Sequence, residues 1–326
     1  MFDFEFAVQA PFRMQPGLRR LAPGAAHLTP LAPGTRHQRE KLAVLSAFWP
    51  QALVQRPGFD AVPALAALSA HAAAEHPLAW RDDGERVEAL QLGTALDGTD
   101  VRVTAPGRFG LGDEVARCLS GLPAAWRRAA LLALAFEEDF ALVVTAPGVQ
   151  FATVPWLAVT LPSHWAPERM VGLSLAQIHA AVPDNALLLH ATDALVRLVG
   201  GSERWERFVW NVTGQPRLHT HPERTESSGH ERWRHTPVAR AWLRSERQTF
   251  IALPALGQAL FTIRVGVVPL ADSVSTPARA AALHDAIASM TPAVLAYRGL
   301  APVRDDLLAW LAARAGGATP SAAGAA

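Results

Sequence analysis

The chain has 326 residues, half of them hydrophobic, so it is long enough to bury the core of one large domain or two ordinary ones. Its 30 basic and 29 acidic residues leave a net charge of +1, which argues against a dedicated nucleic-acid binder. Cys118 is the single cysteine, which excludes an internal disulfide, a cysteine-ligated iron–sulfur cluster and a cysteine-built structural zinc site. The N-terminus lacks the pattern of a signal peptide, and no apolar run reaches the ~18 residues of a membrane span. We therefore expect a soluble, cytoplasmic protein.

The first part of the chain, 1–136, is predicted to be an N-terminal arm and a helical elaboration with a small hairpin. Prolines and glycines in residues 1–37 favour an extended arm that lies on the body of the protein. Helical spacing predicts helices at 37–49 and 62–77, and one or two helices at 113–136 with a break near Gly121. A turn between two strand-like runs predicts the hairpin at 87–105.

The pattern changes in 137–270, where strands dominate. Strands are predicted at 139–146, 151–162, 207–214, 241–254 and 257–270. Two short helices and a longer one at 184–201 are predicted between the second strand and the third. This order predicts an α+β fold, in which helices cross one five-stranded antiparallel sheet, as in a PAS domain. C-terminal helices are expected within 271–315, and 316–326 is too small and polar to pack, which predicts a disordered tail.

A short helix that opens at Ser174 presents one histidine. Leu175, Ile178, His179 and Val182 share one helix face, so the imidazole of His179 belongs to an apolar stripe. Such a histidine is either a core residue that is hydrogen-bonded to backbone or an axial ligand of a metal or haem iron.

Charged and polar side chains interrupt the predicted strand 241–254. Arg244, Glu246, Arg247 and Gln248 would be costly to bury without a partner or a ligand, although a solvated strand face is the alternative interpretation. Alternation places Arg247 on the face opposite to Glu246 and Gln248.

Several segments together resemble the haem-dependent oxidative N-demethylase α-subunit family. In chain order they are PFRMQPGLRRL, EEDFALVV, LPSHWAPERMVGLSLAQIHAAVP, LRSERQTFIALPALGQALFTIR and YRGLAPVRDDLLAWL, which span about residues 11 to 311. The resemblance implies a haem-binding PAS fold, with haem b as cofactor, that oxidises the N-methyl group of a small secondary amine such as dimethylamine with O2.

The resemblance also implies that electrons come from a reductase partner that carries FMN and a 2Fe–2S cluster. This chain has neither a cysteine cluster nor a dinucleotide-binding glycine fingerprint, and so has no means to collect electrons from a nicotinamide itself. We expect no nucleic-acid or membrane partner.

Given this resemblance, the expected haem ligand is His179, with His164 and His190 as competitors. A guanidinium suits a haem propionate, so Arg247 is the first expectation for a propionate or the oxygen side, with Glu246 as its internal partner. The other expected cofactor contacts are Arg244, Gln248 and Arg264.

Four residues are candidates for the catalytic pocket. A cationic amine calls for a carboxylate or an aromatic face, which Glu138 and Asp139 would provide at the start of a strand; a solvated pair at a strand edge is the alternative. Trp210 and Asn211 are expected to line the distal pocket. For Tyr297, the only tyrosine, we expect a structural hydrogen bond to backbone.

Two further hypotheses compete with a haem enzyme. One is a non-catalytic haem PAS protein that binds a gas or another ligand. The other is a non-haem metal hydrolase that uses histidines of a polar loop, where an HxH pair is typical of zinc or iron ligands. The histidines concerned are His219, His221, His230 and His235.

Overall fold

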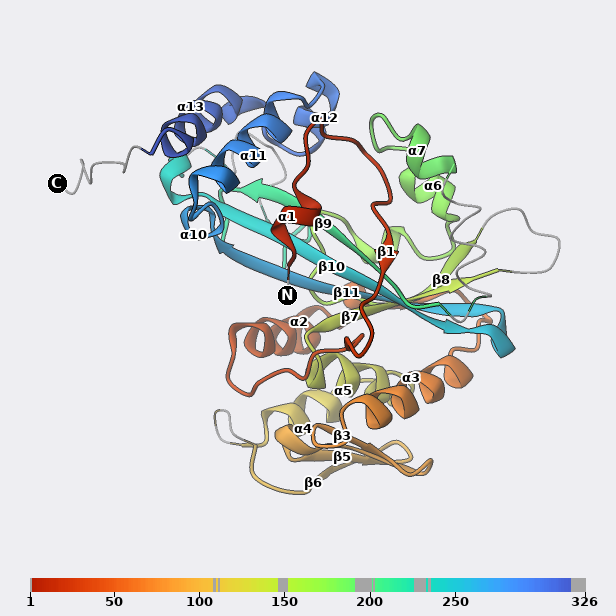
Figure 1. Ribbon diagram of the computed structural model, residues 1–326. Coiled ribbons are helices and arrows are strands. Elements are labelled where there is room, and N and C mark those ends of the chain that lie inside the picture. The colour runs from red at the N-terminus through yellow and green to blue at the C-terminus, as the bar shows by residue number, and fades with distance from the viewer. Residues whose placement is uncertain are drawn as a thin grey trace.

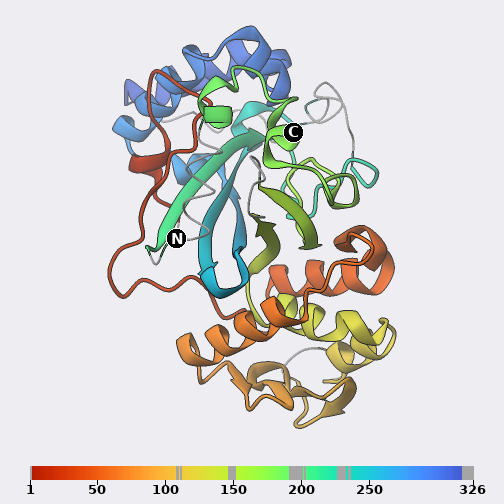
Figure 2. The same ribbon diagram turned by 90° about the vertical axis from the view of Figure 1, so that its right-hand side faces the viewer.

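The computed structural model shows two antiparallel sheets with helices between and around them (Figures 1 and 2). It describes residues 2–107, 110, 112–145, 152–190, 201, 203–225, 233 and 236–317. Helices α2, α3 and α5 lie between the large sheet and the small one, and the C-terminal helices pack at the other end of the molecule (Figure 1). Within the described residues, no helix combines the length and the apolar character that a membrane crossing requires.

The large sheet has seven strands where five were predicted. Its order is β1-β9-β10-β11-β7-β8-β2, and every neighbouring pair is antiparallel. The five predicted strands are all present, as β7 (Glu138–Val144), β8 (Thr153–Ala158), β9 (Trp205–Thr213), β10 (Trp242–Leu253) and β11 (Gln258–Pro269). The two extra strands, β1 (Arg19–Arg20) and β2 (Leu53–Gln55), cover its edges, and strands this short are weak sequence signals.

The N-terminal part forms a helical layer and a second sheet. Its helices are α1 (Phe4–Ala7), α2 (Arg36–Ala52), α3 (Val62–Glu75), α4 (Glu114–Ser120) and α5 (Arg127–Ala135). The predicted small hairpin is a four-stranded meander of β3 (Trp80–Asp82), β4 (Arg86–Ala89), β5 (Thr94–Asp97) and β6 (Asp100–Val103). Side chains of α2, α3, α5 and both sheets share one apolar core.

The C-terminal helices cover part of the large sheet. They are α10 (Leu270–Ser273), α11 (Pro277–Ala288), α12 (Pro292–Tyr297) and α13 (Arg304–Ala315), and they share a core with Trp210, Val212 and Leu243 of the sheet. Residues of the N-terminal arm, Phe4 and Val8, complete this core. Most of the predicted tail, 318–326, lies outside the described residues.

The two faces of the large sheet differ in what covers them. Directly opposed residues of antiparallel strands share a face, so Arg207, Gln248 and Ile263 lie on one side, which we call face A. Phe208, Arg247 and Arg264 lie on the other side, face B. The cores of the N-terminal and C-terminal helices contain apolar residues of face B.

Face A is covered by the segment between β8 and β9. This segment contains a 3-10 helix (Pro167–Arg169), α6 (Leu175–His179) and α7 (Ala186–His190). Leu175 and Ile178 pack against an apolar cluster that includes Ile263 and Val265, which lie on face A. The longer helix predicted at 184–201 is described only as α7, because 191–200 lie outside the described residues.

Candidate functional site between helix α6 and face A

Helix α6 is held by local hydrogen bonds that fix the position of His179. The Ser174 side chain accepts from the Gln177 N–H at 3.2 Å, and the Gln177 side chain accepts from the Ser174 N–H at 2.8 Å, forming a capping box. Asn185 donates to the His179 carbonyl oxygen at 3.0 Å, which ties the end of α6 to the start of α7.

The surroundings of His179 favour a neutral imidazole. Burial lowers the pKa of this ring, and the positive charge of Arg207 lowers it further. A hydrogen bond with the backbone of Leu175 acts in the opposite direction. A neutral ring with one nitrogen hydrogen-bonded to backbone leaves a lone pair on the other nitrogen, which is the state in which histidine binds a metal.

Three polar side chains of face A keep buried atoms without a hydrogen-bond partner among the described residues. They are the Nε of Arg207, the Oε1 of Gln248 and the Oδ1 of Asn211. Arg207 stands directly opposite Gln248, and Asn211 lies four residues further along β9 on the same face. Burial lowers the pKa of Arg207 to about 10, opposed by the charge of Glu246, so the guanidinium still carries its charge at neutral pH. A buried cation with a free N–H, close to the histidine, suits an anionic ligand.

Arg244 also lies on face A, but its guanidinium is fully used inside the protein. It donates to the Ser163 hydroxyl at 2.7 Å and to the carbonyl oxygens of Arg217, Leu218, Leu161 and Pro162 at 2.7 to 3.3 Å. Arg244 therefore holds two loops against the end of the sheet.

Glu246 is the acceptor at the centre of the face A network. Its carboxylate accepts from the Ser163 hydroxyl and, at 2.6 Å, from the Gln248 amide. Its expected partner Arg247 lies on face B and donates instead to Glu206 at 2.8 Å.

The register separates Arg247 and Arg264 from His179. These two arginines oppose each other on face B, the side away from α6. Arg247 also donates to the Ala26 carbonyl oxygen at 2.9 Å, and Arg264 donates to Glu137 at 2.5 Å. Both guanidiniums thus have carboxylate partners within the protein, and neither faces the candidate site.

The predicted catalytic carboxylates are buried and do not converge. Glu138 lies on face B, where its carboxylate accepts from the Thr29 N–H at 2.8 Å. Asp139 lies on face A, and its carboxylate is occupied by Lys41 at 3.1 Å, the Thr160 hydroxyl at 2.6 Å and the Leu161 N–H at 2.7 Å. The ion pair between Asp139 and Lys41, both almost fully buried, fixes α2 to the sheet.

Of the two predicted pocket residues on β9, only Asn211 faces the α6 side. The amide nitrogen of Asn211 donates to the Arg298 carbonyl oxygen at 3.0 Å. Trp210 lies on face B, where its indole N–H donates to the Ala7 carbonyl oxygen at 2.9 Å within the C-terminal core.

The HxH pair does not form one ligand set. The rings of His219 and His221 stack with their centroids 6.1 Å apart. His221 accepts from the Glu223 N–H through Nδ1, so its Nε2 carries the proton and donates to Glu168 at 3.1 Å. His221, Glu168 and Glu223 do lie close enough to share an ion. However, both ring nitrogens of His221 already have hydrogen-bond partners within the protein. His230 and His235 lie outside the described residues.

Three predicted positions remain: His164, His190 and Tyr297. His164 adopts a positive φ of 64° before the 3-10 helix, and its N–H donates to the Thr220 carbonyl oxygen. The side chain of His190 lies outside the described part of α7. Tyr297 is half exposed at the end of α12.

Residues 121–308 match the sequence model of one family, described as "Haem-dependent oxidative N-demethylase, alpha subunit-like". The match covers more than half of the 326 residues and includes the large sheet from β7 to β11, α6 and most of the C-terminal helices. The chain belongs to this family. The resemblance predicted from the sequence is therefore confirmed, and the family description implies haem dependence and a partner subunit for this N-demethylase-like α-subunit.

The residues on face A fit a haem. His179 offers a neutral nitrogen donor, and Arg207 offers a buried N–H without a partner among the described residues. Arg207 was not among the predicted site residues, although strand alternation in RFVWNVTG placed it on the face of Asn211.

Proposed function

We propose that this chain is a haem-dependent oxidative N-demethylase that acts on a small secondary amine. Haem b would lie between α6 and face A, where His179 would hold its iron. One observation carries the proposal. In a chain of this family, His179 lies on the helix that covers face A, its surroundings favour the neutral imidazole, and polar side chains of face A keep buried atoms without a partner among the described residues.

We further propose that β7–β11 form a PAS-like unit. Two strands, a helical segment and three strands follow in sequence, and the last strand, β11, lies beside the first, β7, within the order β9-β10-β11-β7-β8. In such a unit the ligand lies between the sheet and the crossing helices, which is the side where His179 is found. Strands β1 and β2 are additions at the edges of this unit.

Each residue would have a defined part in holding the cofactor. The lone pair of His179 would bind iron, and the hydrogen bond with the Leu175 backbone would orient the ring. Arg207 would donate to a propionate. The unpaired Oε1 of Gln248 and Oδ1 of Asn211 would accept from a ligand on the same face. A covalent c-type attachment needs a pair of cysteines, and Cys118 is the only cysteine, so the haem would be held by these contacts alone.

Haem, when bound, supplies the iron at which O2 is activated. In the proposed overall reaction, O2 takes up two electrons and two protons, and the N-methyl group leaves as formaldehyde. The other products are the primary amine and water. The electrons would come from a partner that carries FMN and 2Fe–2S. Phe250 and Phe261 pack on face A with ring centroids 5.0 Å apart and would offer an apolar surface to the methyl group.

An absorption spectrum of the purified protein, before and after dithionite, tests haem binding. We expect a Soret band that His179→Ala abolishes and that His284→Ala, at a partly exposed position on helix α11, leaves intact. An unchanged spectrum in His179→Ala would refute the ligand assignment.

Turnover distinguishes an enzyme from a haem protein that only binds a gas. With a flavin and iron–sulfur reductase and NADPH, dimethylamine should increase O2 consumption and yield formaldehyde in equal amount. A haem-loaded protein whose O2 consumption does not respond to amines would favour the non-catalytic alternative.

A further inference from the structure

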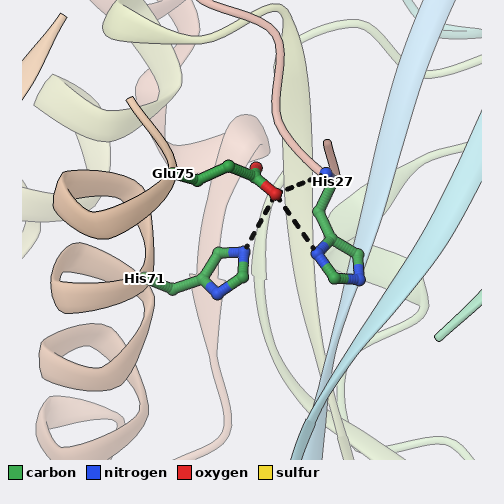
Figure 3. Close-up of side chains that lie close together, drawn as sticks. All are labelled: His27, His71 and Glu75. Carbon is green, nitrogen blue, oxygen red and sulfur yellow. Dashed lines mark hydrogen bonds and ion pairs between the residues drawn. The ribbon is translucent and has the colours of Figure 1, made fainter. Parts of the chain in front are cut away.

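A group of imidazoles surrounds one carboxylate outside the haem site. His71 and Glu75 lie one turn apart on α3, and His27 comes from the N-terminal arm (Figure 3). One ligand atom from each residue lies within 4.8 Å of the others. The ring nitrogens of His27 and His71 point at the same carboxylate oxygen from two sides (Figure 3).

The distances within this group are longer than hydrogen bonds. The Oε1 of Glu75 lies 3.6 Å from the His27 Nδ1 and 3.7 Å from the His71 Nε2. Ligand atoms bound at about 2.0–2.1 Å to a tetrahedral zinc ion lie about 3.3–3.4 Å apart. The two separations from the Glu75 oxygen are therefore close to those of a zinc site.

One ring nitrogen of the group has no other use. The Nε2 of His71 is buried and has no hydrogen-bond partner among the described residues. A buried ring nitrogen that makes no hydrogen bond is available to a metal ion.

The carboxylate is oriented by backbone, as metal-binding carboxylates commonly are. The N–H groups of His27 and Leu28 donate to the two oxygens of Glu75, each at 2.9 Å. His76 hydrogen-bonds through Nε2 to the Leu28 carbonyl oxygen at 2.9 Å, so it supports the same loop through that nitrogen.

One cation already stands near the group. The Nη2 of Arg204 lies 3.2 Å from the His27 Nδ1 and 3.6 Å from the Glu75 Oε1. Its side chain is more than a third exposed, so it has room to move outward when an ion enters. In the metal-free protein the guanidinium would pair with Glu75, and it would therefore compete with the metal ion for this carboxylate.

We propose that His27, His71 and Glu75 form a binding site for a divalent transition-metal ion, with Zn²⁺ as the ion that best suits two imidazoles and one carboxylate. Three protein ligands leave the fourth position to water, since His71 is partly exposed. The ion would tie the arm, which also supplies β1, to helix α3. This site is separate from the proposed haem site and does not depend on it.

Zinc titration of the purified full-length chain against a chromophoric chelator tests the proposal. We expect one Zn²⁺ per chain, bound at least tenfold more weakly by His71→Ala and equally well by the control His284→Ala. His71 is partly exposed, so its replacement should leave the fold and the Soret band unchanged. Wild-type protein that binds Zn²⁺ no better than His71→Ala would overturn the proposal.

Two further measurements address the geometry and the competitor. Co²⁺ in place of Zn²⁺ should give the intense visible bands of a four-coordinate site, and bands of a six-coordinate ion would contradict it. Arg204→Gln should bind Zn²⁺ at least as tightly as wild type, because it removes a competing positive charge. Weaker binding by Arg204→Gln would show that the group is an ion-pair network and not a metal site.

Discussion

The most quantitative prediction concerns Glu138, a carboxyl group buried beneath the N-terminal layer. Only 1% of this residue is exposed, and its Oε1 has no hydrogen-bond partner among the described residues. Burial raises the pKa of Glu138 from 4.5 to about 7, although the hydrogen bonds from Thr29 and the charge of Arg264 oppose this shift. In the folded protein, Glu138 therefore stays protonated at pH values at which an exposed glutamate is ionised.

The sign and size of the effect follow from this pKa. The folded pKa lies above the unfolded one, so this contribution to stability is fully present below pH 4.5 and is lost as the pH rises through 7. A shift of this size corresponds to about 3 kcal/mol at 1.36 kcal/mol per pKa unit. Replacing Glu138 with Gln removes the titration and retains an acceptor for the Thr29 N–H.

Urea unfolding of wild type and Glu138→Gln at pH 5, 6, 7 and 8 measures this effect. The free energy of unfolding of the variant, relative to wild type, should rise by about 2 to 3 kcal/mol between pH 5 and pH 8. Asp305→Asn is the control, since its carboxylate is 92% exposed and the difference from wild type should stay constant. A Glu138→Gln difference that does not change with pH would refute the reasoning.

Other substitutions test the interior and the haem site. Arg207→Met on face A should reduce haem retention, while Arg247→Met on face B should leave the Soret band in place; equal losses in both would contradict the assignment of faces. Lys41→Met leaves the carboxylate of Asp139 buried without its cation, so chemical denaturation should show a loss of about 3–5 kcal/mol, and a loss below 1 kcal/mol would mean that the pair is hydrated. Ser174→Ala removes the cap of α6, worth about 1 kcal/mol, and haem titration should show roughly fivefold weaker binding; unchanged affinity would show that α6 does not position the ligand.

Much of the fold could be predicted from local patterns. Strand alternation located β7 to β11, and the break near Gly121 separated α4 from α5 as expected. The edge strands β1 and β2 were missed because two or three residues carry no periodicity, and they exist through pairing with β9 and β8. The meander was predicted only as a hairpin for the same reason.

The candidate site was harder to predict because strand register decides it. Sequence alternation showed that Arg247 and Gln248 point to opposite sides of β10, but not which side faces α6. Only the packing of Leu175 and Ile178 on face A assigns that side to Gln248. Likewise, the Lys41 that occupies Asp139 comes from a helix almost a hundred residues away, and no local pattern reveals that partner.

The four arginines of β9, β10 and β11 fall into two classes, and the difference between them argues for the ligand. Arg244, Arg247 and Arg264 all have their guanidiniums bonded to carbonyl or carboxylate oxygens or to a hydroxyl, as structural arginines do. Arg207 retains a buried N–H without such a partner among the described residues. A cation in that position costs folding free energy in the absence of a ligand.

Replacing an arginine of each class should therefore change the stability of the haem-free protein in opposite directions. In haem-free protein, Arg207→Met should unfold at the same or higher urea concentration than wild type, whereas Arg247→Met, which leaves Glu206 buried without its partner, should unfold earlier. Haem added to wild type stabilises the folded state through its binding free energy, and Arg207→Met should lose most of that gain. Since the same substitution is harmless without the ligand and harmful with it, a structural role for Arg207 would not reproduce this result.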